Sequence, residues 1–243
     1  MLHHEDRGPI AVITLDRPER RNAINLETLV QLDEAIEATS ADPAKRALIL
    51  TGAEGHFCAG ADLSGVEDAE FVAVLARVLD GLRNATFPTI AAVEGAALGA
   101  GAQLAVACDL RVAAADAMFG IPAAKLGLMV DQWTVRRLAD VLGQGTARAV
   151  LLAADTISGE RAFALGLVQR MGTIDLALEW AHHIATLAPL TILGHKIGLN
   201  QAEELPPTTP EYAAAFTRAW SSADLSEGLL AFRERRPPKF RGT

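Results

Sequence analysis

Two glycine-rich stretches dominate the sequence: His56-Phe57-Cys58-Ala59-Gly60-Ala61-Asp62-Leu63 and Gly95-Ala96-Ala97-Leu98-Gly99-Ala100-Gly101-Ala102-Gln103. Each lies between an apolar run with the composition of a buried strand and a stretch of helical composition. At such a turn, the first backbone N–H groups of the helix have no partner within the helix and can face a ligand. Gly and Ala also let a donor approach a developing oxyanion to within about 3 Å. Together the two turns predict an oxyanion hole with two backbone donors.

Two other interpretations of these turns remain open. A single glycine-rich turn is also explained by close packing of a helix on a sheet. Gly99-Ala100-Gly101 additionally suggests a dinucleotide-binding turn, but the third glycine of that pattern would fall at Leu104. The occurrence of both turns in one chain favours the oxyanion hole.

Composition limits the class of protein. The chain has 243 residues, half of them apolar, which is enough to bury one large core. The 22 basic residues are outnumbered by 30 acidic ones, which argues against a general nucleic-acid or membrane-surface binder. No apolar run reaches the roughly 20 residues of a membrane span, and the first residues do not resemble a signal peptide. We therefore expect a cytoplasmic protein.

The two cysteines, Cys58 and Cys108, both stand in apolar surroundings. They suggest neither a disulfide framework nor a zinc site. The histidines likewise offer no ligand cluster: His182 and His183 share a predicted helix, and His56 precedes the first turn without an obvious partner. We expect surface or packing roles for them and no metal centre.

Apolar runs of strand type alternate with helical patterns along the first half of the chain. This alternation predicts an α/β fold with largely buried strands. The expected strands are Ile10 to Leu15, Ala47 to Leu50, Ile90 to Val93 and Leu110 to Val112. After Asp131 we expect mainly helices: Thr134 to Leu142, Thr146 to Ala153, Glu160 to Leu165 and Leu176 to Leu187. A proline-rich break, Leu205 to Pro210, precedes a last helical stretch.

Further motifs accompany the two turns: Arg17 to Asn22, Cys58 to Leu63, Pro88 to Gly95, Ala97 to Gly101, Ala107 to Asp109, Phe119 to Pro122, Ala164 to Val168 and a basic C-terminal tail. Together these motifs resemble the crotonase (enoyl-CoA hydratase/isomerase) superfamily. The resemblance covers nearly the whole chain. It implies a ββα spiral core over residues 1–205, with a C-terminal helical arm over 206–243 that belongs to the same domain or to a trimerisation region.

The resemblance also implies a ligand and its contacts. The backbone N–H groups of Ala61 and Ala100 would face the carbonyl of a coenzyme A thioester, with no cofactor bound covalently. Positions that would contact coenzyme A are Arg20, Arg21, Ala59, Asp62, Leu63, Lys239 and Phe240. Asp62 is equally compatible with a turn or a helix cap, and an exposed arginine is often only solvated surface.

The sequence departs from the family pattern at the two acid–base positions. Hydratases of this family use two glutamates to activate and position the water that adds to the enoyl double bond. The matching residues here are Gln103 and Ala123. Glutamine can orient a water but does not accept its proton near neutral pH, and alanine does neither. In this respect the chain resembles a mycobacterial branch of the superfamily that lacks both glutamates.

One acid stands nearby in the sequence. Asp131 matches a region where some crotonase relatives carry a catalytic aspartate, but it is also a natural N-cap for the helix that follows. Trp133 either lines an acyl pocket or fills core, and core is the simpler expectation.

Two functions therefore remain open at this stage. The first is an acyl-CoA-binding protein of fatty acid metabolism with weak or no hydratase activity. The alternative is an active enoyl-CoA hydratase or isomerase, a lyase-type or other acyl-CoA enzyme that uses Asp131. The apolar positions Tyr212, Phe216, Trp220 and Leu230 of the C-terminal arm predict packing on another subunit, in a homotrimer or a dimer of trimers.

Overall fold

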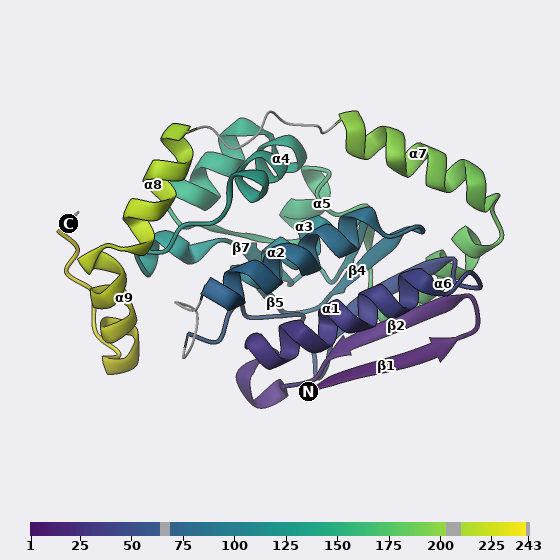
Figure 1. Cartoon of the computed structure of the whole chain (residues 1–243), viewed down its shortest axis with the longest axis horizontal. Helices are drawn as coiled ribbons and strands as arrows, with labels where there is room; N and C mark the ends of the chain where they lie inside the picture. The colour runs from purple at the N-terminus through teal and green to yellow at the C-terminus, as the bar shows by residue number, and fades with distance from the viewer. Residues whose placement is uncertain (64–68, 203–209, 242–243) are drawn as a thin grey trace. The chain divides into compact units, whose positions relative to one another are not determined.

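A computed structural model describes residues 1–63, 69–202 and 210–241 of the chain (Figure 1). The chain divides into two compact units. The first comprises Met1–Phe119 and Ser158–Glu204, and the second comprises Gly120–Ile157 and Leu205–Thr243. The predicted boundary between residues 205 and 206 lies outside the described residues, as does most of the proline-rich break, so the predicted division into core and arm stays a prediction.

A six-stranded sheet forms the centre of the first unit, with strand order β1-β2-β3-β4-β6-β9. β1 pairs antiparallel with β2, and every other pair is parallel. The strands are β1 (Leu2–Arg7), β2 (Ile10–Leu15), β3 (Ala47–Gly52), β4 (Thr89–Val93), β6 (Leu110–Ala113) and β9 (Arg170–Met171). All four predicted strands are confirmed, and with them the α/β fold. β1 was not predicted, because its residues are almost all polar and it is an exposed edge strand.

Helices bury the sheet as expected for parallel strands, which hide both faces. The helices of this unit are α1 (Leu26–Ala41), α2 (Ala69–Asn84), α3 (Ala100–Ala107), α5 (Gly159–Ala164), α6 (Ile174–Ala185) and α7 (Pro189–Ala202), with the 3-10 turn η1 (Pro18–Arg20). On one face, Ala177, Ala181 and Ile184 of α6 pack on strand residues such as Ile49 and Ile90. The helices predicted around α5 and α6 are confirmed.

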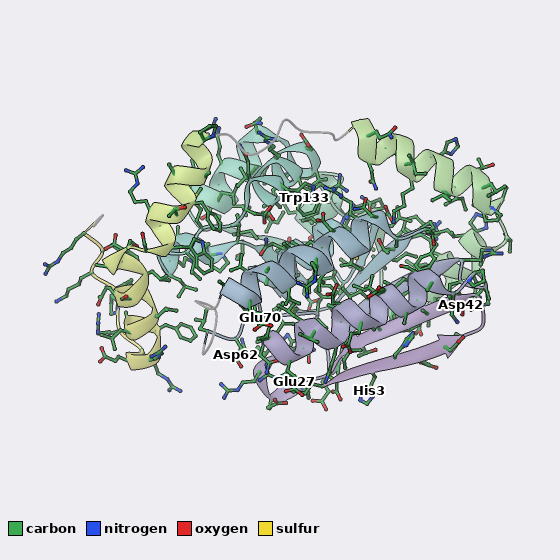
Figure 2. All side chains as sticks on the ribbon, in the orientation of Figure 1. His3, Glu27, Asp42, Asp62, Glu70 and Trp133 are labelled. Atoms are coloured by element: carbon green, nitrogen blue, oxygen red, sulfur yellow. The ribbon has the colours of Figure 1, made fainter. Side chains whose placement is uncertain are left out.

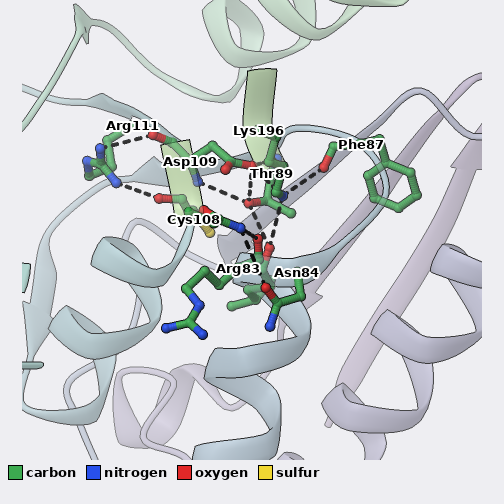
Figure 3. A network of polar contacts seen from close by, with 10 residues as sticks. Arg83, Asn84, Phe87, Thr89, Cys108, Asp109, Arg111 and Lys196 are labelled. Atoms are coloured by element: carbon green, nitrogen blue, oxygen red, sulfur yellow. Dashed lines mark hydrogen bonds and ion pairs between the residues drawn. The ribbon is translucent and has the colours of Figure 1, made fainter. Parts of the chain in front are cut away.

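A buried ion pair fastens α7 to this core (Figure 3). Lys196 is 6% exposed, and its Nζ donates to Asp109 Oδ2 at 2.7 Å and to the Phe87 carbonyl at 2.9 Å. The same carboxylate oxygen accepts from Thr89 N at 2.7 Å and Thr89 Oγ1 at 2.9 Å. Asp109 directly follows Cys108, the C-cap of α3, so the network anchors the C-terminal end of that helix.

A small second sheet has strand order β5-β7-β8. Its strands are β5 (Ala96–Leu98), β7 (Met118–Gly120) and β8 (Thr156–Ser158). β5 lies within the second glycine-rich stretch, so that stretch begins as a strand before it opens α3.

The second unit is mainly helical, as predicted for the residues after Asp131. It contains η2 (Pro122–Lys125), α4 (Gln132–Leu152), α8 (Pro210–Trp220) and α9 (Ala223–Glu234). The two helices predicted within 134–153 form one element with a break at Gly143, whose φ of 74° is not helical. The predicted last helical stretch is two helices, because Ser222 caps the start of α9. Among the described residues, no helix combines the length and the apolar character needed to cross a membrane.

Candidate thioester site

The two glycine-rich stretches lie against each other in the first unit. Phe57 N donates to the Glu94 carbonyl and Cys58 N to the Ala96 carbonyl, both at 2.7 Å. Leu98 N donates back to the Cys58 carbonyl at 3.0 Å. Stretches separated in sequence are thus paired by backbone hydrogen bonds, as the oxyanion-hole hypothesis requires.

Glycine is needed where the two backbones approach most closely. A Cβ on Gly101 would lie 2.2 Å from the Cys58 carbonyl oxygen, and a Cβ on Gly60 would lie 3.0 Å from the Leu98 carbonyl oxygen. Gly60 and Gly99 also have positive φ angles of 115° and 54°, which L side chains rarely adopt. The same Cβ position on Gly60 is 3.9 Å from Ala100 N, which places the two predicted donors in one neighbourhood.

The second donor, Ala100 N–H, is the first N–H of α3. The carbonyl of the same peptide, that of Gly99, accepts from Gln103 N at 3.1 Å and so points into the helix. Because the N–H and C=O of a trans peptide point in opposite directions, Ala100 N–H points out of the helix N-terminus. Within the described part of the chain it donates no hydrogen bond. The partial positive charge of the helix end favours an oxyanion there.

The first donor, Ala61 N–H, is oriented by a different contact. Ile24 N donates to the Gly60 carbonyl at 2.9 Å, and Asp62 N donates to the Ile24 carbonyl at 2.7 Å, so Ile24 and Ala61 form a parallel bridge. The Gly60 carbonyl therefore faces Ile24, and Ala61 N–H of the same peptide faces away from it. In residues 1–63, 69–202 and 210–241, Ala61 N–H has no hydrogen-bond acceptor.

Arg17 and Asn22 hold the segment that carries Ile24. Arg17 Nη2 lies 3.0 Å from Asp62 Oδ2, and Arg17 Nη1 donates to the Ala23 carbonyl at 2.7 Å. Asn22 has a positive φ of 56° and is 1% exposed. Its Oδ1 accepts from Arg17 N, and its Nδ2 donates to two carbonyls of the loop after β3, those of Ala53 and His56.

The two residues that match the family's glutamate positions, Gln103 and Ala123, belong to different units. Gln103 is 6% exposed and occupies the first turn of α3, so the same residue supplies the N–H that orients the Ala100 peptide. Ala123 is half-buried in η2. Neither side chain titrates, so neither takes or gives a proton at neutral pH.

Asp131 is the N-cap of α4. Its Oδ1 accepts from Thr134 N at 2.9 Å and its Oδ2 accepts from Thr134 Oγ1 at 2.6 Å. Both carboxylate oxygens therefore take part in the helix cap. Trp133, which is labelled in Figure 2, is the second residue of α4. Its side chain is half-buried rather than fully in the core.

The residues predicted to contact coenzyme A fall into two groups. Arg20 and Arg21 are exposed on η1 and at its end, while Ala59, Asp62 and Leu63 of the first unit are half-buried. Lys239 and Phe240 are exposed on the C-terminal tail of the second unit.

That tail is folded back on α9. Arg236 donates to both carboxylate oxygens of Glu227, at 2.6 and 2.9 Å, and Lys239 N donates to Glu227 Oε1 at 2.7 Å. The hydrogen bonds from Arg236 lower the pKa of Glu227 to about 2. Because the pKa in the unfolded chain is higher, the stability that these contacts contribute is fully present above about pH 4.5 and is lost as the pH falls through about 2.

Histidines and cysteines contribute packing. His56 Nδ1 accepts from Ala96 N at 3.4 Å, which gives His56 a partner in the second stretch. Cys58 and Cys108 are free and buried, and burial raises the pKa of each thiol to about 12. Among the described residues, no group of His, Cys, Asp and Glu is arranged to hold a metal ion.

Comparison with known proteins places the chain in a family. The family model described as "Enoyl-CoA hydratase/isomerase" matches residues 5–243 of this chain. The probable enoyl-CoA hydratase echA6 of Mycobacterium bovis is 43% identical over 234 residues, which cover 96% of both chains. The chain belongs to the enoyl-CoA hydratase/isomerase, or crotonase, family. Mouse (Mus musculus) mitochondrial methylglutaconyl-CoA hydratase is a further relative, 33% identical over 99% of this chain and 82% of its own.

Solved structures agree with this assignment to the crotonase family. A carnitinyl-CoA hydratase from Mycobacterium avium has a TM-score of 0.87 and 33% identity, covering 100% of this chain and 98% of its own. A methylmalonyl-CoA decarboxylase has a TM-score of 0.91 and 25% identity at the same coverage. The crotonase-like fold expected from the motifs is confirmed.

At this candidate site, the sequence alone did not single out Arg17 or Asn22. Both stand in the Arg17 to Asn22 motif, but their partners lie far along the chain, at Asp62, Ala53 and His56. The signal available was the composition of a tight turn rich in arginine and asparagine, which does not identify the partner.

Proposed function

We propose that this crotonase-family protein binds acyl-CoA, holds the thioester carbonyl between Ala61 N–H and Ala100 N–H, and hydrates enoyl-CoA weakly or not at all. The observation that carries the proposal is the pair of donors on adjoining turns, beside a glutamine on the helix that supplies one of them. The two N–H groups can bind a carbonyl oxygen, but the Gln103 side chain cannot accept or donate the proton that hydration requires.

The chemistry separates binding from turnover. Backbone donors aimed at a thioester oxygen stabilise charge on that oxygen whatever reaction follows. Hydration also needs a base to take the proton of the attacking water and an acid to complete the addition. Each such group contributes about 10²–10⁴-fold to a rate, so replacing both by Gln103 and Ala123 removes most of the acceleration.

Cationic side chains support a coenzyme A ligand. Arg20 and Arg21 are exposed close in sequence to the segment that carries Ile24, and Lys239 is exposed on the tail that is hydrogen-bonded to Glu227 of α9. Phosphate groups pair well with arginine and lysine, so these residues are the proposed partners of the coenzyme A phosphates. The acyl-CoA is a ligand, and no covalently bound cofactor is part of the proposal.

The test uses the unmodified protein in two assays. Calorimetric titration with a saturated acyl-CoA is expected to show binding, while crotonyl-CoA hydration is expected to stay below the usual enzymatic range of about 1–10³ s⁻¹. Turnover within that range would overturn the proposal. The variant Gln103→Glu with Ala123→Glu asks a further question: a gain in hydration would show that the missing carboxylates limit the rate.

The second candidate function is an active hydratase or isomerase that uses Asp131. The names of the relatives favour it, since echA6 and the mouse protein are described as hydratases. Asp131→Asn keeps an N-cap side chain and removes the proton-transfer group. If the protein turns over crotonyl-CoA and this variant loses turnover while its acyl-CoA affinity and unfolding midpoint hold, the active-enzyme alternative is correct.

We also propose assembly into a homotrimer or a dimer of trimers through the C-terminal helices. Leu230 is 45% exposed and Phe232 is 60% exposed on α9, which is costly for apolar side chains in water. Phe216 stacks on Trp220 with ring centroids 5.7 Å apart, so these two residues of α8 are partly covered within the unit; the side chain of Tyr212 lies outside the described residues. A monomeric mass by light scattering at micromolar concentration would contradict the assembly.

A further inference from the structure

The Ala61 peptide depends on a contact with a distant segment. Its orientation follows from the hydrogen bond between Ile24 N–H and the Gly60 carbonyl, because the two ends of that peptide point in opposite directions. The bridge between Ile24 and Ala61 is isolated and belongs to no continuous strand. An isolated bridge lacks the neighbouring ladder bonds that hold a residue in register within a sheet.

Arg17 spans this bridge from its side. Its Nη1 donates to the carbonyl of Ala23, which precedes Ile24, and its Nη2 pairs with the carboxylate of Asp62, which follows Ala61. One rigid guanidinium therefore joins both sides of the bridge at once. Lysine, a point charge on a flexible stem, does not present this fork of donors.

The ion pair is shielded from water. The side chains of Arg17 and Asp62 are 12% and 16% exposed. By contrast, the Arg77 and Asp33 pair between α2 and α1 has the same kind of geometry, at 2.9 Å, but its arginine is 59% exposed. Exposed pairs contribute little because water and salt screen them, whereas a shielded and forked pair fixes geometry.

We propose that Arg17 is a positioning residue for the thioester carbonyl, acting through Asp62 and Ala23 to hold the Ala61 N–H in its donating orientation. The inference rests on the proposed function, since it assumes that Ala61 N–H meets the thioester oxygen. In this role Asp62 binds Arg17 and so helps to hold the Ala61 peptide in its orientation. The family resemblance instead implies a direct contact between Asp62 and coenzyme A.

The experiment compares two ligands that differ at the carbonyl. One is an acyl-CoA thioester, and the other is the S-alkyl-CoA thioether of equal chain length, which lacks the carbonyl oxygen. The ratio of their affinities measures recognition of the carbonyl alone. In Arg17→Met the ratio is expected to fall about threefold, less than the roughly tenfold loss of thioester affinity expected when a donor N–H is deleted outright.

Three further variants and one spectrum separate positioning from general damage. Asp62→Asn is expected to fall in the same direction, Arg17→Lys to recover part of the loss, and the matched control Arg77→Met to leave the ratio unchanged. The infrared stretch of a carbon-13-labelled thioester carbonyl is expected to move to lower wavenumber on binding, and to move less in Arg17→Met. Thermal unfolding confirms that each variant is folded.

The outcomes distinguish the two proposals. If the unmodified protein itself binds thioester and thioether equally and leaves the carbonyl stretch unchanged, the proposed function fails and the role of Arg17 fails with it. If the unmodified protein favours the thioester and folded Arg17→Met and Asp62→Asn keep the same ratio and carbonyl stretch, the role of Arg17 alone is overturned.

Discussion

The two donor peptides of the candidate thioester site are oriented by opposite means. The Gly99–Ala100 peptide is fixed locally, because the Gly99 carbonyl accepts the first hydrogen bond of α3 from Gln103. The Gly60–Ala61 peptide is fixed by Ile24, which lies in a separate segment held by Arg17 and Asn22. A helix start thus orients its own donor, whereas a loop needs an external support.

The largest expected effect on stability is at the contact between the two glycine-rich stretches, where Gly101 lies against Cys58. Gly101→Ala would put a methyl group 2.2 Å from the Cys58 carbonyl oxygen. A backbone atom cannot move aside as easily as the end of a flexible side chain, so the clash is costly. We expect a loss of about 4 kcal/mol in the free energy of unfolding, measured by urea denaturation. The control Gly145→Ala in α4 meets nothing within 4 Å, and it is expected to stabilise slightly through helix propensity. A mild effect of Gly101→Ala would show that the two stretches separate easily.

The next largest expected effect on stability is at the Lys196–Asp109 ion pair, which lies at the C-terminal end of the helix that carries the second proposed donor. Lys196→Met removes the cation paired with Asp109 at the end of α3, leaving a partly buried carboxylate with only its Thr89 donors. The expected cost is about 3 kcal/mol of stability. The thioester-to-thioether affinity ratio is expected to stay unchanged, because the Ala100 peptide is oriented within α3 itself. A fall in that ratio comparable to that of Arg17→Met would break the contrast between the two donors.

Deleting the second donor is expected to change affinity rather than stability. Proline suits the first position of a helix, so Ala100→Pro removes the N–H with little damage to α3. The thioester is expected to bind about tenfold more weakly, or about 1.4 kcal/mol, while the thioether holds its affinity. Ala100→Gly keeps the donor and serves as the control. Equal losses for both ligands in titration calorimetry would show that Ala100 N–H does not meet the carbonyl.

The smallest expected effect belongs to the side-chain link between the stretches. His56 Nδ1 accepts a long hydrogen bond from Ala96 N, at 3.4 Å. His56→Leu is expected to lose only about 0.5–1 kcal/mol in chemical denaturation. The contacts of Phe57, Cys58 and Leu98, which are all backbone, would remain. A loss as large as that of Gly101→Ala would mean that the side chain, not the backbone, joins the two regions.

The same contrast explains what the sequence could predict. The four central strands and the second turn depend on patterns within a few residues, so apolar runs and glycines were enough to find them. The break of α4 at Gly143 fits two shorter predicted helices for the same reason. Strand β1 was missed because its exposed, charged residues carry no apolar signal.

Support for the first donor was not predictable in this way. Arg17 finds Asp62, and Asn22 finds Ala53 and His56, only after the chain has folded. A single sequence shows that arginine and aspartate are present but not that they meet. The resemblance supplied the two proposed donors, and the fold supplied the contacts that orient their peptides.

Because both thiols are buried, the rate at which each one is alkylated would report how often the structure around it opens. Alkylating reagents attack thiolates, and a thiol with a pKa of about 12 inside the core reacts only when its surroundings separate. Cys58 lies where the glycine-rich stretches meet, whereas Cys108 closes α3 beside the Lys196 network. Labelling rates at the two sulfurs, resolved by mass spectrometry, would therefore time the parting of the donors and the release of α7 as separate events in the folded protein.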